Sequence, residues 1–96
     1  MSAKVTIYTT SICPYCIRAK ALLQQKNVAF DEINVESRPE LRGWLIERSR
    51  QRTVPQVFVN GEPLGGFTDI AALDQQGKLD PLLAREPAAT DPPVLT

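Results

Sequence analysis

The sequence has no histidine, only two cysteines and one tryptophan in 96 residues, and no excess charge of either sign. Because histidine is the usual general base of enzymes, any catalysis must depend on thiol chemistry, carboxylates or backbone dipoles. Lysine plus arginine equals aspartate plus glutamate, at 11 each, so the formal net charge is zero. No overall electrostatic field therefore points to nucleic acid or a membrane surface as a partner.

Long hydrophobic runs are absent as well. No apolar stretch approaches the roughly 20 residues of a membrane-spanning helix. Only the first few residues precede the first predicted strand, so we expect no signal peptide. Secreted domains of this size often carry several disulfides, whereas this chain has one C-x-x-C pair. We therefore expect a cytoplasmic protein with a single modest hydrophobic core.

Both cysteines lie in the tetrapeptide Cys13-Pro14-Tyr15-Cys16, between an apolar, β-rich run at 5–8 and a helical run at 19–25. A C-x-x-C pair in this setting is typical of thioredoxin-like redox chemistry. The first N–H groups of a helix carry partial positive charge, so they favour the thiolate form of Cys13. Cys16 falls in the first helical turn, close enough to attack a mixed disulfide on Cys13.

Two structural roles for the cysteine pair fit the sequence less well. A disulfide that closes so short a loop removes little chain entropy. A zinc site needs four ligands, and without histidine or a third cysteine it would require two chains or carboxylate help. The pattern therefore favours redox activity.

The hydrophobic pattern predicts the element order β-α-β-α-β-β-α. Strands are expected at 4–9, 28–35, 56–59 and 62–64, and helices at 14–26, from about 37 to 49, and at 70–76, with a short turn or helix at 79–84. The first crossover implies parallel strand pairing, and Asn60-Gly61 predicts a tight hairpin. We expect an α/β fold with a four-stranded mixed sheet flanked by helices over residues 1–85, and a disordered tail over 86–96.

Some local details also follow. Ser37 and Glu40 have the spacing of a capping box for the second helix, and Thr68 or Asp69 is expected to cap the third. Cys16 shares the inward stripe of its helix with Ala19, Leu22 and Leu23, so it should be the more buried cysteine.

Three motifs together resemble the glutaredoxin family, specifically its small dithiol kind. They are Cys13-Pro14-Tyr15-Cys16, Thr53-Val54-Pro55 and Gly65-Gly66-Phe67-Thr68-Asp69, and the resemblance covers about residues 3–84. It implies a thioredoxin-like fold and glutathione-dependent thiol–disulfide exchange. Cys13 would attack the glutathione sulfur of a glutathionylated protein, and a second glutathione would regenerate the thiol. Cys16 would be needed only for protein disulfides.

The resemblance also implies a glutathione site, comprising Tyr15, Gln51, Arg52, Thr53, Val54, Pro55, Gly66, Phe67, Thr68 and Asp69. Val54, before a cis Pro55, would offer backbone groups to the cysteinyl part of glutathione. The segment 66–69 would hold the γ-glutamyl end, and Gln51 or Arg52 the glycyl carboxylate. Structural roles stay open: a helix cap at 68–69, a core position for Phe67, and cations at 48–52 that complement a helix dipole.

Two positions depart from the common family pattern. Many members carry lysine where this chain has Thr10, so thiolate stabilisation falls more heavily on the helix start and on Arg18. Many also have glycine near Arg50, where a helix could end in a left-handed residue.

Two other functions fit the sequence less well, and a dimer-bridging iron–sulfur cluster is kept as at most a secondary activity. In an iron–sulfur carrier, a cluster bridges two chains with glutathione, but such relatives usually have Cys-Gly-Phe-Ser at the site. In a donor reduced by a flavoprotein reductase, the segment 65–69 would have no γ-glutamyl group to bind. We expect a monomeric oxidoreductase with glutathione as reducing co-substrate, no resident metal, glutathionylated or disulfide-containing proteins as substrates, and no nucleic-acid or membrane partner.

Overall fold

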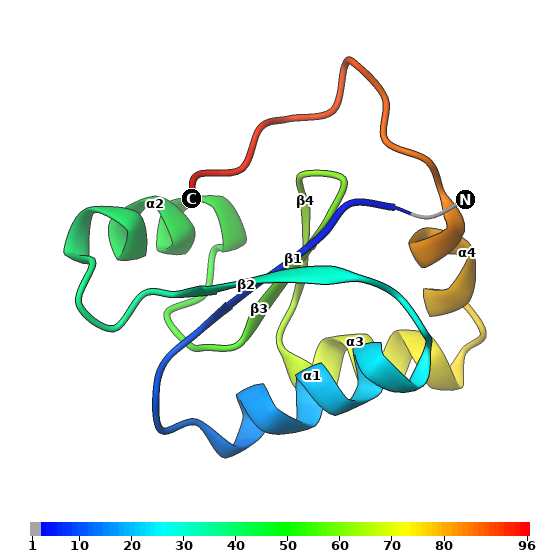
Figure 1. Ribbon diagram of the computed structural model, residues 1–96, viewed down its shortest axis with the longest axis horizontal. Helices are drawn as coiled ribbons and strands as arrows, with labels where there is room; N and C mark the ends of the chain where they lie inside the picture. Colours follow the sequence, from blue (N-terminus) through cyan, green and yellow to red (C-terminus); the bar gives the residue numbers. More distant parts are fainter. Residues whose placement is uncertain (1–2) are drawn as a thin grey trace.

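A four-stranded mixed sheet with helices on both faces forms the centre of the computed structural model, which describes residues 3–96 (Figure 1). The strands are β1 (Val5–Thr9), β2 (Phe30–Asn34), β3 (Gln56–Val59) and β4 (Glu62–Gly65), and the helices are α1 (Pro14–Gln25), α2 (Pro39–Ser49), α3 (Phe67–Gln75) and α4 (Leu79–Ala84). The strand order is β2-β1-β3-β4. The predicted α/β fold and element order are confirmed, with the final turn formed as α4.

Strand pairing follows the predicted connections. β1 pairs parallel with β2 and antiparallel with β3, which pairs antiparallel with β4. The β3–β4 turn has positive φ at both central residues, 52° at Asn60 and 81° at Gly61. This is the conformation that an Asn-Gly hairpin favours, because its twist matches that of the strands.

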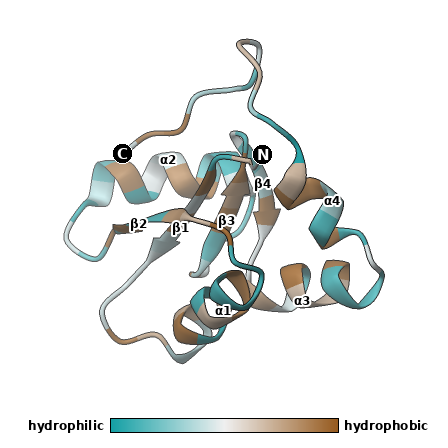
Figure 2. Cartoon of the chain, turned by 45° about the vertical axis from the view of Figure 1, so that its right-hand side comes forward, coloured by the Kyte–Doolittle hydropathy of each residue, from teal (hydrophilic) through white to brown (hydrophobic). Residues whose placement is uncertain are grey.

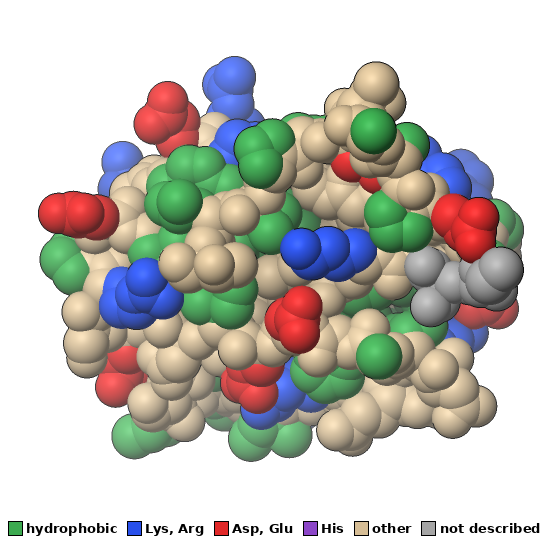
Figure 3. All heavy atoms as spheres, turned by 45° about the horizontal axis from the view of Figure 1, so that its top comes forward, with side chains coloured by type: hydrophobic (Ala, Val, Ile, Leu, Met, Phe, Trp, Pro, Cys, Tyr) green, Lys and Arg blue, Asp and Glu red, His purple; other side chains and the backbone are tan. Residues whose placement is uncertain are grey.

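The sheet separates two hydrophobic clusters, because successive side chains of a strand point to opposite faces. On one face, Val5 and Ile7 pack with residues of α1, α3 and α4; on the other, Tyr8 and Phe58 pack with α2. Figure 2 shows hydrophobic segments along the central strands, with hydrophilic residues alternating on the helices. On the face drawn in Figure 3, charges of both signs are interspersed.

The starts of α2 and α3 differ from those predicted from the sequence. α2 has Arg38 as its N-cap with no side-chain capping bond, so the predicted capping box is wrong; Pro39 supplies the first helical residue instead. α3 begins at Phe67, not Ile70, with Gly66 as its N-cap. Two non-glycine residues follow helices in the left-handed region, Asn27 (φ 58°) after α1 and Arg50 (φ 63°) after α2.

The segment after α4 contains no helix or strand, yet it lies across the face of the sheet that carries α2 (Figure 1). The side-chain amide of Asn60 donates to the carbonyl of Arg85, and Arg38 donates to the carbonyl of Thr96. Val94 packs against the Tyr8–Phe58 cluster. Disorder of residues 86–96 stays a prediction; a disordered tail would lose these hydrogen bonds and the packing of Val94.

Within residues 3–96, no helix is both long and apolar enough to cross a membrane.

Candidate active site

The two cysteines lie at the start of α1, where β1 leads into the helix. Cys13 is the N-cap residue, with extended backbone, and its sulfur accepts a hydrogen bond from the N–H of Cys16 at 3.1 Å. The two cysteines form a disulfide with their Cα atoms 5.1 Å apart. Cys13 is partly exposed, whereas Cys16 is 2% exposed. Cys16 is therefore the more buried cysteine, as predicted, and Cys13 is the sulfur that a partner can reach.

The loop before β3 lies against Cys13. The Val54–Pro55 peptide bond is cis, as the family resemblance implies. The carbonyl oxygen of Val54 is 3.7 Å from Sγ of Cys13, which places a backbone polar group beside the sulfur. Pro55 is buried under the loop and leads directly into β3. Backbone groups at Val54 are thus positioned to pair with an extended ligand whose own sulfur meets Cys13.

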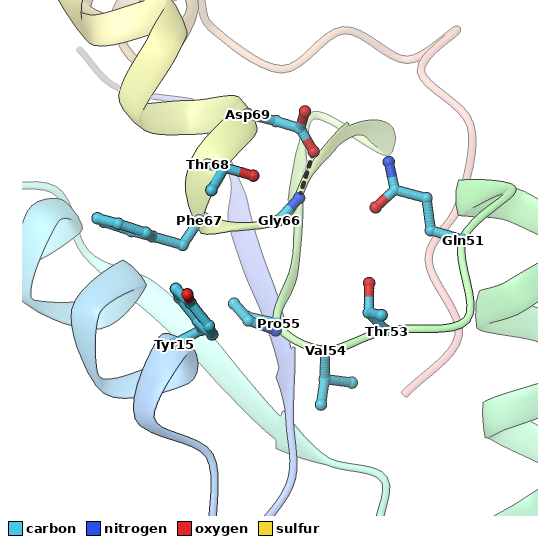
Figure 4. A pocket seen from close by; sticks show the side chains of 9 residues that line it. All are labelled: Tyr15, Gln51, Thr53, Val54, Pro55, Gly66, Phe67, Thr68 and Asp69. Carbon is cyan, nitrogen blue, oxygen red and sulfur yellow. Dashed lines mark hydrogen bonds between the residues drawn. The ribbon is translucent and has the colours of Figure 1, made fainter.

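A cavity of about 240 Å³ opens beside this loop (Figure 4). Its lining contains the residues of the predicted glutathione site except Arg52: Tyr15, Gln51, Thr53, Val54, Pro55, Gly66, Phe67, Thr68 and Asp69. They come from α1, from the loop before β3 and from the start of α3. Arg52 is exposed, and its carbonyl accepts a hydrogen bond from Arg42. The motifs that are separate in the sequence therefore meet at one cavity.

The β4–α3 junction forms one end of the cavity. The carboxylate of Asp69 accepts a hydrogen bond from the N–H of Gly66 at 2.9 Å, across the first turn of α3 (Figure 4). Gly65 has φ of 108°, and a Cβ there would collide with the Asp69 carboxylate. Glycine at this position therefore lets the acidic side chain fold back onto the turn. The predicted N-cap at Thr68 or Asp69 is therefore wrong: Gly66 is the N-cap, and Asp69 is the third helical residue, whose side chain bonds back to the N–H of Gly66.

Two aromatic rings form a second wall. The rings of Tyr15 and Phe67 lie 6.2 Å apart between centroids, and the guanidinium of Arg18 lies 5.3 Å from the centroid of the Tyr15 ring. Tyr15 is 52% exposed, so about half of its side chain faces solvent. Phe67 also packs against the cluster below α3. Both roles considered for Phe67, cavity wall and core, are thus filled by one side chain.

Gln56 supports the cavity from beneath, a role that was not predicted from the sequence. It is fully buried in β3, and its amide nitrogen donates to the Thr53 carbonyl at 2.8 Å and to the Gln51 side-chain oxygen at 3.0 Å. Thr53 and Gln51 both line the cavity. The signal in the sequence was a polar residue opening an otherwise apolar strand. Buried polar groups are normally hydrogen-bonded, so such a residue indicates a fixed loop partner.

Comparison with known proteins assigns the family. The glutaredoxin family model matches residues 5–64, which is more than half of the chain. The chain belongs to the glutaredoxin family. A glutaredoxin of Pseudomonas aeruginosa is 51% identical over 80 residues, covering 83% of this chain and 95% of the relative.

Solved structures agree with this assignment. The solution structure of a glutaredoxin from Brucella melitensis has 49% identity and a TM-score of 0.77, and the match covers 85% of this chain and 89% of that one. A crystal structure of a buckwheat glutaredoxin–glutathione complex has 28% identity and a TM-score of 0.79, covering 84% and 76%. This glutaredoxin is thus a thiol–disulfide oxidoreductase of thioredoxin-like fold, with Cys13 and Cys16 as its redox-active pair.

Proposed function

We propose that this glutaredoxin uses glutathione as its reductant and acts on glutathionylated proteins and protein disulfides. One observation carries the proposal: nine of the ten residues predicted for a glutathione site line the cavity beside Cys13. The buckwheat relative, of similar fold, was crystallised as a glutathione complex. A cytoplasmic location and a monomeric state stay predictions.

The reaction begins at the more accessible sulfur. In the reduced enzyme, the Cys13 thiolate attacks the glutathione sulfur of a mixed disulfide, the substrate thiolate leaves, and glutathione stays bound to Cys13. A second glutathione thiolate attacks this bond, releasing oxidised glutathione and the Cys13 thiolate. With a protein disulfide, Cys16 attacks the mixed disulfide instead and closes the Cys13–Cys16 bond. The short reach from Cys16 to Cys13 makes this second attack intramolecular.

Each end of glutathione has a counterpart in the cavity. Val54 lies beside Cys13, where its backbone can pair with the cysteinyl residue of glutathione. The first turn of α3 offers N–H groups and the Thr68 hydroxyl to the γ-glutamyl carboxylate, and the Asp69 carboxylate can meet the γ-glutamyl ammonium. Gln51, across the cavity from Asp69 (Figure 4), is a candidate for the glycyl end.

The test is glutathione-coupled reduction of a small mixed disulfide, followed through glutathione reductase and NADPH. We expect activity in the wild type, its loss in Cys13→Ser and its retention in Cys16→Ser. Reduction of a protein disulfide should be lost in both variants. A wild type that reduces protein disulfides with a dithiol reagent, but shows no turnover with glutathione, would contradict the proposal while leaving the redox pair intact.

A further inference from the structure

Three consecutive residues of the tail contact β1 and α2. Val94 packs against the cluster that Tyr8 shares with residues of α2. The Leu95 carbonyl accepts a hydrogen bond from the Tyr8 hydroxyl at 2.7 Å. The Thr96 carbonyl accepts one from Arg38, the N-cap residue of α2, at 3.2 Å. The end of the tail therefore lies beside α2 (Figure 1).

The helix α2 is attached to the sheet through a narrow apolar face. Of its 11 residues, Leu41 and Leu45 are buried, and Trp44 is partly buried in the same cluster. The helices α1, α3 and α4 contribute to the cluster on the opposite face of the sheet. A helix of this length is marginal alone and depends on burial of its apolar face. Packing of Val94 on the same cluster therefore helps to hold α2 in place.

The far end of α2 holds the loop that lines the cavity. The hydroxyl of Ser49 donates to the Gln51 carbonyl at 3.1 Å and accepts from the Gln51 N–H at 3.2 Å. Arg42, in the middle of α2, donates to the Arg52 carbonyl at 3.3 Å. Gln51 and Thr53 both line the cavity beside the redox pair. The position of α2 therefore sets the position of this side of the cavity.

A second set of contacts joins the tail to the same loop through the sheet. Tyr8, whose hydroxyl is bonded to the Leu95 carbonyl, pairs with Gln56 where β1 and β3 run antiparallel. Directly paired residues of neighbouring strands lie on the same face of the sheet. Gln56 in turn donates to Thr53 and Gln51. Both sets of contacts thus begin at the tail and end at the loop before β3.

We propose that the tail positions α2, and with it the loop at 51–54, for the binding of glutathione. The proposal rests on the proposed function, because it assigns an effect on glutathione affinity to residues far along the chain. The residues that line the cavity all precede the tail, so the effect is one of position and not of contact. Tail docking and glutathione binding then strengthen each other, because coupling between two sites is reciprocal.

The first measurement is backbone hydrogen exchange, followed by mass spectrometry on the oxidised full-length protein and on a protein that ends at Arg85. We expect exchange in the segment 41–52 to be about fivefold faster without the tail, with a smaller change in α1 at 14–25. Val94→Ala should give part of this effect, whereas Leu95→Ala, at an exposed side chain, should give none. Unchanged exchange at 41–52 in the shortened protein would overturn the proposal. An equal rise in both segments would do so too, because it would reflect a general loss of stability.

The second measurement separates glutathione binding from thiol chemistry. In the glutathione-coupled assay, the KM for a glutathione mixed disulfide should rise about threefold in the shortened protein. The control is the rate constant for attack by Cys13 on a small aromatic disulfide that contains no glutathione, measured in reduced Cys16→Ser protein with and without the tail. This rate constant should change by less than about twofold, because the tail does not act on the sulfur.

An unchanged KM in the shortened protein, or an equal loss in the two reactions, would overturn the proposal. A wild type with no glutathione turnover would refute the proposed function, and with it the effect of the tail on glutathione binding. The exchange measurement needs no glutathione, so it would still show whether the tail holds α2 and its loop. The two proposals therefore fail in distinguishable ways.

Discussion

The hydroxyl of Tyr8 donates a hydrogen bond to the backbone carbonyl of Leu95, with 2.7 Å between the two oxygens. The bond joins the central strand β1 to a tail 87 positions further along the chain. Tyr8 is fully buried, and its ring contacts those of Phe58 and Trp44. The tail and α2 therefore cover this face of the sheet together. Trp44 lies in the same cluster, so its fluorescence can report whether the tail is in place.

Removing the tail should lower stability. A protein that ends at Arg85 loses the packing of Val94 and the acceptor for Tyr8, at a combined cost of about 1–3 kcal/mol. The measurement is urea unfolding followed by Trp44 fluorescence. Val94→Ala should account for part of the loss, whereas Leu95→Ala, on an exposed neighbour with the same backbone, should be nearly neutral. Equal stability of the full-length and shortened proteins would instead support a disordered tail.

Alkaline pH should weaken the same face of the protein. Burial raises the pKa of Tyr8 to about 12, against a smaller opposing effect of Arg48. In the unfolded chain a tyrosine ionises near pH 10. The Tyr8 contribution is thus complete below about pH 10 and is lost as pH rises toward 12, because the unfolded state releases its proton first. Unfolding free energies should fall less steeply above pH 10 in Tyr8→Phe than in the wild type. A Tyr8→Phe slope equal to that of the wild type would contradict this prediction.

Arg50 should tolerate replacement by glycine with a gain in stability. It ends α2 with φ of 63°, and its N–H donates to the carbonyl of Ile46. A residue with a Cβ is disfavoured in the left-handed region, and glycine is not. We expect Arg50→Gly to raise the free energy of unfolding by about 0.5–1 kcal/mol, and Arg50→Ala to give no gain. If alanine stabilised as much as glycine, backbone strain would not be the cause.

The sequence predicted the fold well because its local signals agreed with one another. The alternation in β1, the Asn60-Gly61 turn and the stripe that includes Cys16 each had one consistent interpretation. The failures came where tertiary contacts decide. The first turn of α3 starts early because Asp69 can reach back to Gly66 past a residue with no Cβ. No local pattern describes the surface of β1, β3 and α2 that the tail contacts, and disorder of residues 86–96 stays a prediction.

Gln56 is the residue at which the missed information bears most directly on activity. Its amide group holds Thr53 and Gln51 from within the sheet, so Gln56→Met, which keeps the length but removes both donors, should loosen the loop that lines the cavity. We expect the KM for a glutathione mixed disulfide to rise by about three- to tenfold, which corresponds to about 1 kcal/mol of lost binding in total, with a smaller change in kcat. Thr6→Val is the matched control, since Thr6 is buried on the same sheet but does not line the cavity. Both variants should unfold at lower temperature. An unchanged KM in Gln56→Met would show that Gln56 contributes to stability but does not position the loop for glutathione.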